Sequence, residues 1–165
     1  MQMCLAYFWG IEPQKVALAR QMDVLGAVGG ISPGMVGMND FHNWEYEAIK
    51  AVQQAWKDEG LTLRVIEGPP SLYTKTKLGL EGRDEEIANF ITFMKNISGL
   101  GIDTVCYNWM PVISWARTTL DKPSRGGALV SSFRTEDIAD EPMFPEYGKV
   151  THDKMWKNME YFLKV

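Results

Sequence analysis

The chain has 165 residues, of which 45% are hydrophobic and 23% are charged, values that are ordinary for one soluble globular domain with a full core. Its net charge of −4 and its lack of a basic block argue against a nucleic-acid partner. No apolar run approaches the roughly 18 residues that span a membrane. We therefore expect no membrane partner. Cys4 and Cys106 form no CxxC motif, so we expect reduced thiols and a cytoplasmic protein.

Four short apolar runs end at glycine, proline or polar residues, as buried strands do. They cover residues 5–9, 24–28, 61–66 and 104–108. Helical patterns lie between them at 13–22, 44–59 and 84–97, and a last helix follows Thr151. This alternation predicts an α/β fold with a parallel sheet. Right-handed crossovers would gather the loops after the strands at one end of the sheet.

The helical patterns also predict which side chains are buried. Asn43 and Asp84 are expected to cap their helices, and each helix carries an apolar stripe. The stripes are Trp44, Ala48, Val52 and Trp56 in the second helix, Ile87, Phe90, Ile91, Met94 and Ile97 in the third, and Met155, Met159, Phe162 and Leu163 in the last. Cys106 is expected to be buried in its strand.

Two other segments lack an apolar pattern. Residues 75–83 are predicted to be a polar loop that leaves Lys75 and Lys77 exposed to solvent. Residues 114–150 are rich in proline and glycine, and they are predicted to be a loop insertion rather than part of the core. The insertion would belong to a single domain that covers residues 1–165.

Four stretches are specific enough to indicate a family. They read TKLGLEGRD at 76–84, VCYNWMPV at 105–112, WART at 115–118 and WKNMEYFLK at 156–164. Together they resemble mannonate dehydratase over the whole chain. The resemblance implies a xylose-isomerase-like (β/α)₈ barrel, of the TIM-barrel type, and a hydro-lyase activity. Such a lyase converts D-mannonate to 2-keto-3-deoxy-D-gluconate in hexuronate (glucuronate) catabolism, a branch of carbohydrate metabolism, with a divalent metal, commonly manganese.

The chain is short for that fold, because a complete barrel takes roughly 250 residues. The family's metal-ligand motifs, including a His-Pro-Asp-Asp-Pro-Pro run, do not occur in this sequence. We therefore expect the N-terminal half of a barrel, with about four of its eight units, and we expect the catalytic residues in the absent C-terminal half. His42 and His152 are expected on the surface, so this half alone is not expected to bind Mn²⁺ or another divalent metal.

What this half can supply is substrate positioning. Tyr107 and Asn108 can hydrogen-bond sugar hydroxyls, or they satisfy backbone groups of their own loop. Glu67 is the best-placed acid, with a structural ion pair as its alternative role. Trp9 forms a wall of the pocket or simply packs. Arg117 can bind a carboxylate with two parallel hydrogen bonds, or it is a surface arginine.

Two other functions remain open from the sequence. A truncated half-barrel without the metal would be a non-catalytic assembly module, and a related sugar isomerase would share the fold without accounting for residues 107–118. Four strands opened from a barrel leave unpaired edges and a half-covered interior. We therefore expect a homo-oligomer or a complementary C-terminal half as the protein partner, with D-mannonate as the substrate.

Overall fold

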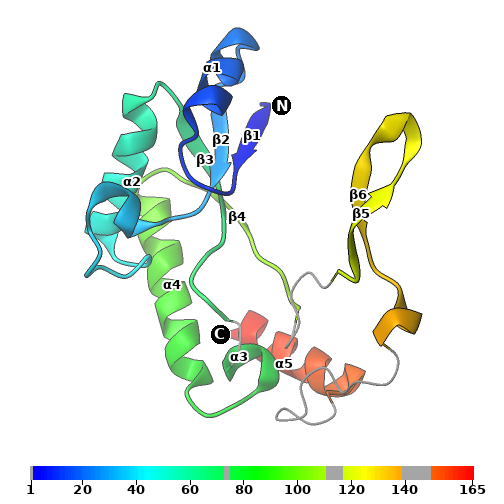
Figure 1. The fold of residues 1–165 in the computed structure, drawn as a ribbon. Helices are drawn as coiled ribbons and strands as arrows, with labels where there is room; N and C mark the ends of the chain where they lie inside the picture. The colour runs from blue at the N-terminus through cyan, green and yellow to red at the C-terminus, as the bar shows by residue number, and fades with distance from the viewer. Residues whose placement is uncertain (1, 73–74, 111–116, 139–149) are drawn as a thin grey trace.

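The computed structural model describes residues 2–72, 75–110, 117–138 and 150–165. Strands and helices alternate through the first two thirds of the chain, and a hairpin and a last helix follow (Figure 1). In chain order the elements are β1 (Cys4–Tyr7), α1 (Pro13–Gln21), β2 (Gly26–Gly29), the 3₁₀ helix η1 (Pro33–Val36), α2 (Tyr46–Asp58), β3 (Thr62–Glu67), α3 (Lys75–Leu78), α4 (Arg83–Gly99), β4 (Thr104–Cys106), β5 (Thr119–Pro123), η2 (Arg125–Gly127), β6 (Leu129–Ser132), η3 (Thr135–Ile138) and α5 (His152–Lys164).

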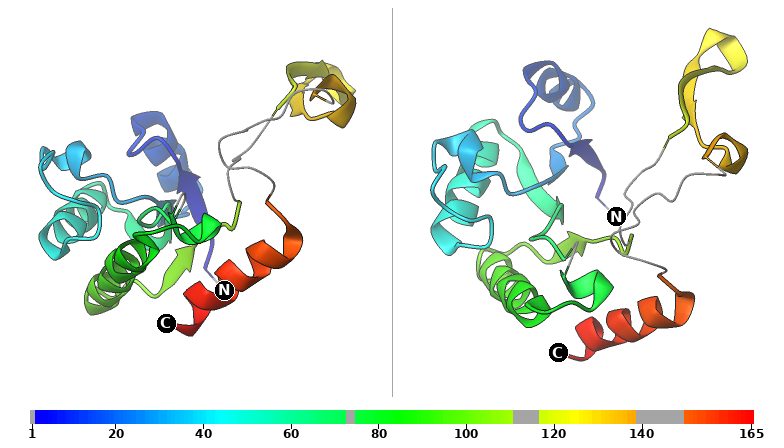
Figure 2. Two further views of the ribbon diagram at one scale, coloured as in Figure 1. Left: turned by 90° about the horizontal axis from the view of Figure 1, so that it is seen from below. Right: turned by 60° about the horizontal axis from the view of Figure 1, so that its bottom comes forward.

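Among the described residues, β1, β2, β3 and β4 form one parallel sheet in that order. The helices that connect them lie in an arc on one side of the sheet (Figure 2). The α/β fold with a parallel sheet that the sequence predicts is thus confirmed. Because each strand lies next to the strand that follows it in sequence, the sheet has the order found in one part of a (β/α)₈ barrel.

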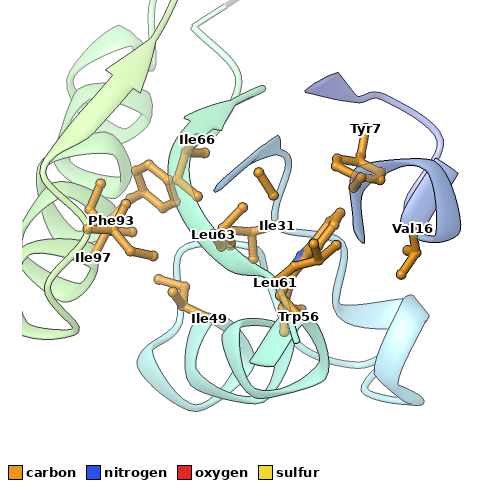
Figure 3. Packing of buried hydrophobic residues seen from close by; sticks show 14 residues of the cluster. Tyr7, Val16, Ile31, Ile49, Trp56, Leu61, Leu63, Ile66, Phe93 and Ile97 are labelled. Atoms are coloured by element: carbon orange, nitrogen blue, oxygen red, sulfur yellow. The ribbon is translucent and has the colours of Figure 1, made fainter. Parts of the chain in front are cut away.

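The core lies between the sheet and the arc of helices (Figure 3). Its side chains come from β1, α1, β2, α2, β3 and α4, and each fully buried aliphatic or aromatic side chain contributes roughly 1.5–3 kcal/mol of transfer free energy. The largest are Tyr7, Val16, Ile49, Val52, Trp56, Leu61, Ile66, Phe93, Ile97 and Ile102. The uncovered face of the sheet has no comparable cluster among the described residues.

The alternation of side chains along a strand determines what lies on the uncovered face. Ile66 is fully buried and pairs in register with Val105, which packs against the core. The next pair in register, Glu67 and Cys106, therefore points to the opposite face, and both residues are exposed. The expectation that Cys106 is buried is wrong, because its strand is covered on one face rather than on both.

Helix α2 begins two residues later than predicted. Ala48, Val52 and Trp56 are buried as expected, and Trp44 packs at the margin of the core ahead of the helix. Asn43 is not the cap, since the N-cap residue is Glu45. The Glu45 carboxylate instead accepts a hydrogen bond from the backbone N–H of His42 at 2.9 Å, so a turn precedes the helix.

Helix α4 also differs from the prediction at its start and on its buried face. Gly82 is the N-cap residue with φ of 85°, so Asp84 is not the cap. Phe93 is completely buried, whereas Met94 is 40% exposed. The stripe that packs on the sheet is Ile87, Phe90, Phe93 and Ile97. The prediction of Met94 as a buried residue is wrong, and its neighbour Phe93 is buried instead, because spacings of three and of four residues both keep side chains on one face of a helix.

Residues 75–83 contain a short helix, α3, where a polar loop was predicted. Lys75 is exposed as expected. Lys77 is only 3% exposed, so the prediction of a solvated side chain is wrong for this residue. Its burial results from the packing of α3 against α4 and α5, which no local pattern signals.

Helix α5 is capped as predicted. Thr151 accepts a hydrogen bond from the backbone N–H of Lys154 at 3.3 Å. Within the helix Asn158 is buried, and Met155, Met159 and Phe162 are half-buried, whereas Leu163 is 59% exposed and does not belong to the buried stripe. The buried face of α5 is narrow because this helix lies against α3 rather than across the sheet.

The insertion at 114–150 contains the antiparallel hairpin β5–β6, which extends away from the sheet (Figure 1). Its side chains are largely exposed, Leu120 at 76% among them. A hydrogen bond of 2.8 Å from Ser124 N to Ala128 O closes the turn of the hairpin. Pro123, Gly126 and Gly127, which predict irregular structure in the sequence, therefore belong to the end of a strand and to the turn. Residues 114–116 and 139–149 of the insertion lie outside the described part of the chain.

His42 and His152 are both exposed, as expected. The part of the chain that the structure describes contains no helix long and apolar enough to cross a membrane.

The Phe93 and Met94 pair tests the observed register of α4. We expect Phe93→Ala to lower the free energy of unfolding by about 3–5 kcal/mol, because it leaves a cavity in the core. Met94→Ala, one residue along and partly exposed, should change it by less than about 1 kcal/mol. Urea titration followed by circular dichroism measures both, and equal losses in the two variants would contradict the register.

Candidate functional site

A pocket of about 270 Å³ lies where β3 and β4 end. It is lined by residues 67–72, Lys77 and residues 106–108, and we call it the β3–β4 pocket. In parallel α/β sheets, binding residues lie at the carboxyl ends of the strands, because the loops after the strands meet there. The position of this pocket is therefore the one that the fold favours for a ligand.

The structure brings three of the predicted site residues together in this pocket. Glu67 is the last residue of β3, and Tyr107 and Asn108 directly follow β4, which ends two residues earlier than predicted. The three lie together because Glu67 pairs in register with Cys106, the last residue of β4. The pocket thus combines a carboxylate, a phenol and an amide, all of which can hydrogen-bond hydroxyl groups.

The other two predicted site residues lie elsewhere. Trp9 follows the end of β1, is 89% exposed and does not line the β3–β4 pocket. Arg117 is exposed at the foot of the hairpin, where its Nε donates a hydrogen bond of 3.0 Å to Ser131 Oγ. A role of Trp9 or Arg117 toward a substrate remains a prediction.

The sequence does not predict Lys77 as a pocket residue. Its Nζ donates a hydrogen bond to Asn108 Oδ1 at 3.1 Å and lies 6.0 Å from the centre of the Trp109 ring. Burial lowers the pKa of this ammonium below its usual value, while the Glu86 carboxylate acts in the opposite direction and more weakly. Lysines are seldom buried, so only the tertiary contacts of α3 reveal this one.

Two neighbouring helices hold α3 in place. At its start, Thr76 donates from its backbone N–H and from its Oγ1 to Glu86 Oε2 on α4, both at 2.8 Å. At its end, Asn158 of α5 donates from Nδ2 to the backbone carbonyl of Lys77 at 2.9 Å. A four-residue helix is not stable alone, so these bonds determine its position.

The approach of Asn158 to α3 requires a glycine. Gly79 has φ of 68°, and a Cβ at this position would lie 2.5 Å from Asn158 Oδ1. Glycine adopts this backbone conformation at little cost and leaves room for the amide.

Aromatic rings close the space between α5 and the end of β4. Phe162 of α5 lies 5.7 Å from both Tyr107 and Trp109, measured between ring centroids. It also contacts Phe90 of α4 edge to face at 5.3 Å. Aromatic pairs at these distances are favourable beyond the area that they bury, so α5 supports the pocket wall as well as α3.

A second pocket, of about 220 Å³, lies beside the first at the ends of β1, β2 and β3. Both pockets are lined by Glu67 and Gly68. Tyr7 Oη and Trp56 Nε1 belong to residues that line it, and within the described residues neither atom has a hydrogen-bond partner. Burial raises the pKa of the Tyr7 phenol, which keeps it a neutral donor.

The described residues do not by themselves fit a metal ion. No group of three His, Cys, Asp or Glu side chains in them is arranged to hold one. Glu67 and Cys106 lie side by side in register and are only two ligating side chains, whereas divalent cations in proteins take four or more ligands.

Comparison with known proteins agrees with the fold and with the resemblance. A family model described as D-mannonate dehydratase (UxuA) matches residues 1–143. The mannonate dehydratase of Streptococcus uberis is 30% identical over 99% of this chain and 52% of its own length, and that of Lactococcus lactis subsp. cremoris is 28% identical over 99% and 53%.

Among solved structures, the crystal structure of mannonate dehydratase from Streptococcus suis serotype 2 superposes with a TM-score of 0.81 and 28% identity. It covers 99% of this chain, and the match covers 48% of that chain. The chain therefore spans about half the length of the relatives that it matches. With the family model covering most of its residues and the fold superposing along nearly its whole length, the chain belongs to the mannonate dehydratase family.

Proposed function

We propose that this chain forms the substrate-positioning half of a mannonate dehydratase site, in which the β3–β4 pocket binds D-mannonate. The observation that carries the proposal is the pocket itself. Glu67, Asn108 and Lys77 line it at the carboxyl ends of β3 and β4, in a chain of this family. A carboxylate and an amide suit hydroxyl groups, and an ammonium suits an acid. We propose that the wider role is hexuronate catabolism in the cytoplasm, which the free thiols of Cys4 and Cys106 support.

The reaction sets requirements that the pocket meets in part. Dehydration removes the proton from the carbon next to the carboxylate and expels the hydroxyl from the following carbon, so that one water leaves. The resulting enol then becomes the 2-keto acid. A carboxylate stabilises the intermediate charge poorly, so the site needs an electrophile and a group that transfers protons.

This chain's own residues bind and orient the substrate. Glu67 accepts hydrogen bonds from substrate hydroxyls on the uncovered face of the sheet, and Tyr107 and Asn108 bind neighbouring hydroxyls from the end of β4. Orientation of this kind lowers the activation barrier because the entropy of alignment is lost on binding rather than in the reaction.

The resemblance also implies a divalent metal, commonly manganese. We propose that its ligands come from the portion of a mannonate dehydratase that this chain does not cover, which is about half of each relative. The donor set in the described residues, with no group of three ligands, supports that division.

We further propose that the uncovered face of the sheet binds a protein partner, either the complementary half or a second copy of this chain. Within the described sheet, β1 and β4 are edge strands. Glu67 at the end of β3 and Cys106 at the end of β4 are exposed. Unpaired edges favour further strand pairing. An assembly role without catalysis predicts such a partner too, but the family match favours the dehydratase.

A fused protein tests the proposed division of the site. The chain would be joined to the part of the Streptococcus suis enzyme that it does not match and assayed for keto acid formed from D-mannonate. We expect product from the fused protein with manganese and none from the 165-residue chain alone. Product from the chain alone would show that this half needs no counterpart, and a folded, inactive fused protein would contradict the proposed function.

Glu67→Gln in the fused protein tests the role of the pocket carboxylate. A hydrogen bond to a charged group is worth about 1.5–3 kcal/mol, so kcat/KM for D-mannonate should fall about 10- to 100-fold. Glu81→Gln, an exposed carboxylate outside the pocket, is the matched control and should leave kcat/KM unchanged. Equal values for the Glu67 variant and the control would remove Glu67 from the site.

A further inference from the structure

We propose that the Lys77 ammonium binds the carboxylate of the substrate, and that α4 and α5 hold it in place for this purpose. The inference rests on the proposed function in taking a sugar acid as the ligand. Lys77, which the sequence predicts to be exposed to solvent, then binds the carboxylate, and Arg117 has no part in binding that group.

The first observation is the position of the side chain. Lys77 lines the β3–β4 pocket although it is 3% exposed, and its Nζ reaches Asn108 Oδ1 at 3.1 Å. The ammonium therefore lies at the carboxyl end of β4, beside two residues proposed to bind substrate hydroxyls. A carboxylate at one end of a polyol chain can meet Nζ while its hydroxyls meet Glu67 and Tyr107.

The second observation is the chemistry around the ammonium. The Asn108 amide oxygen and the indole of Trp109 are two of the groups near the ammonium, and the Glu86 carboxylate favours its charge more weakly than burial disfavours it. The lowered pKa of Lys77 means that its surroundings favour loss of the proton relative to water. A bound carboxylate reverses that balance, since an opposite charge nearby favours the protonated form. A charge-assisted hydrogen bond of this kind is about twice as strong as a neutral one.

The third observation is that the surroundings fix the backbone of Lys77. Glu86 binds the start of α3 through Thr76, and Asn158 binds the carbonyl of Lys77 itself. A flexible lysine loses much side-chain entropy when it binds a ligand. Burial of Lys77 removes a large part of that entropy during folding, so the ammonium is organised before the substrate arrives.

Arg117 was the cation expected to pair with the carboxylate. It is exposed, and its Nε donates to Ser131 of the hairpin. The residues that line the β3–β4 pocket do not include it. Of the two side chains, Lys77 is the one that the described structure places at the pocket.

Competitive acetylation tests the inference on the unmodified chain and on the fused protein without metal. Trace acetic anhydride is applied over a range of pH, and mass spectrometry gives the labelling of each lysine. Without ligand, the labelling midpoint of Lys77 should lie below the value usual for a lysine, and Lys75, which is exposed on the same helix, serves as the reference for reagent access. D-mannonate should slow the labelling of Lys77 and raise its midpoint pH, whereas D-mannitol, which lacks the carboxylate, should do neither.

Variants of the fused protein separate charge from proton transfer. Lys77→Met should raise KM for D-mannonate by about tenfold or more, and Lys77→Arg should restore most of the loss, since arginine keeps the charge but cannot act as a base. Lys75→Met is the control and should leave KM unchanged. A Lys77→Arg variant that binds D-mannonate normally but loses kcat as completely as Lys77→Met would overturn the inference in favour of a proton-transfer role.

The outcomes distinguish this inference from the proposed function. Keto acid formation without protection of Lys77 by D-mannonate overturns the inference and leaves the function standing. Protection of Lys77 by D-mannonate without keto acid formation supports the inference and contradicts the proposed function. Equal protection by D-mannitol and D-mannonate also overturns the inference, because hydroxyl groups would then account for the contact. If D-mannonate leaves Lys77 labelling unchanged in both proteins, the carboxylate binds elsewhere.

Discussion

The packing of helices against one face of a parallel sheet determines which side chains of this protein are left for chemistry. Ile66 and Val105 turn toward α4 and the core, so Glu67 and Cys106, the next pair in register, must turn the other way. The same alternation that buries Ile66 and Val105 in the core therefore also determines that Glu67 and Cys106 line the pocket. A slip of one residue in β3 or β4 would bury a carboxylate and expose the core at once.

The pocket depends on a second constraint, which is tertiary rather than local. Helix α3 is too short to be stable alone and is positioned by hydrogen bonds from α4 and α5, which are far from each other in sequence. Helix α5 follows the insertion, yet it supports the wall of a pocket whose lining residues come much earlier in the sequence. Contacts of this type link the last residues of the described chain to a loop after β3.

The sequence was sufficient to predict the parallel sheet, the burial of Ala48, Val52 and Trp56 in α2, and the cap of α5. It also predicted that Glu67, Tyr107 and Asn108 lie at strand ends, because periodicity and strand ends are local signals. It was insufficient wherever a position depends on distant packing. Phe93 and Met94 both fit a helical stripe, and only the sheet decides between them. Lys77 looks like any solvated lysine until α5 covers its helix, and Cys106 looks buried until one face of its strand proves to be uncovered.

The position of Cys106 has a practical consequence for studying this protein. Its thiol is exposed on the side of the sheet opposite the helices, next to the carboxylate of Glu67. A thiol-specific fluorophore attached there would report by its accessibility and emission whether anything covers that surface. Cys4 is partly covered, so it offers an internal reference of slower reaction. Cys106 is thus a native attachment site for a probe, on the face of the sheet that the helices do not cover.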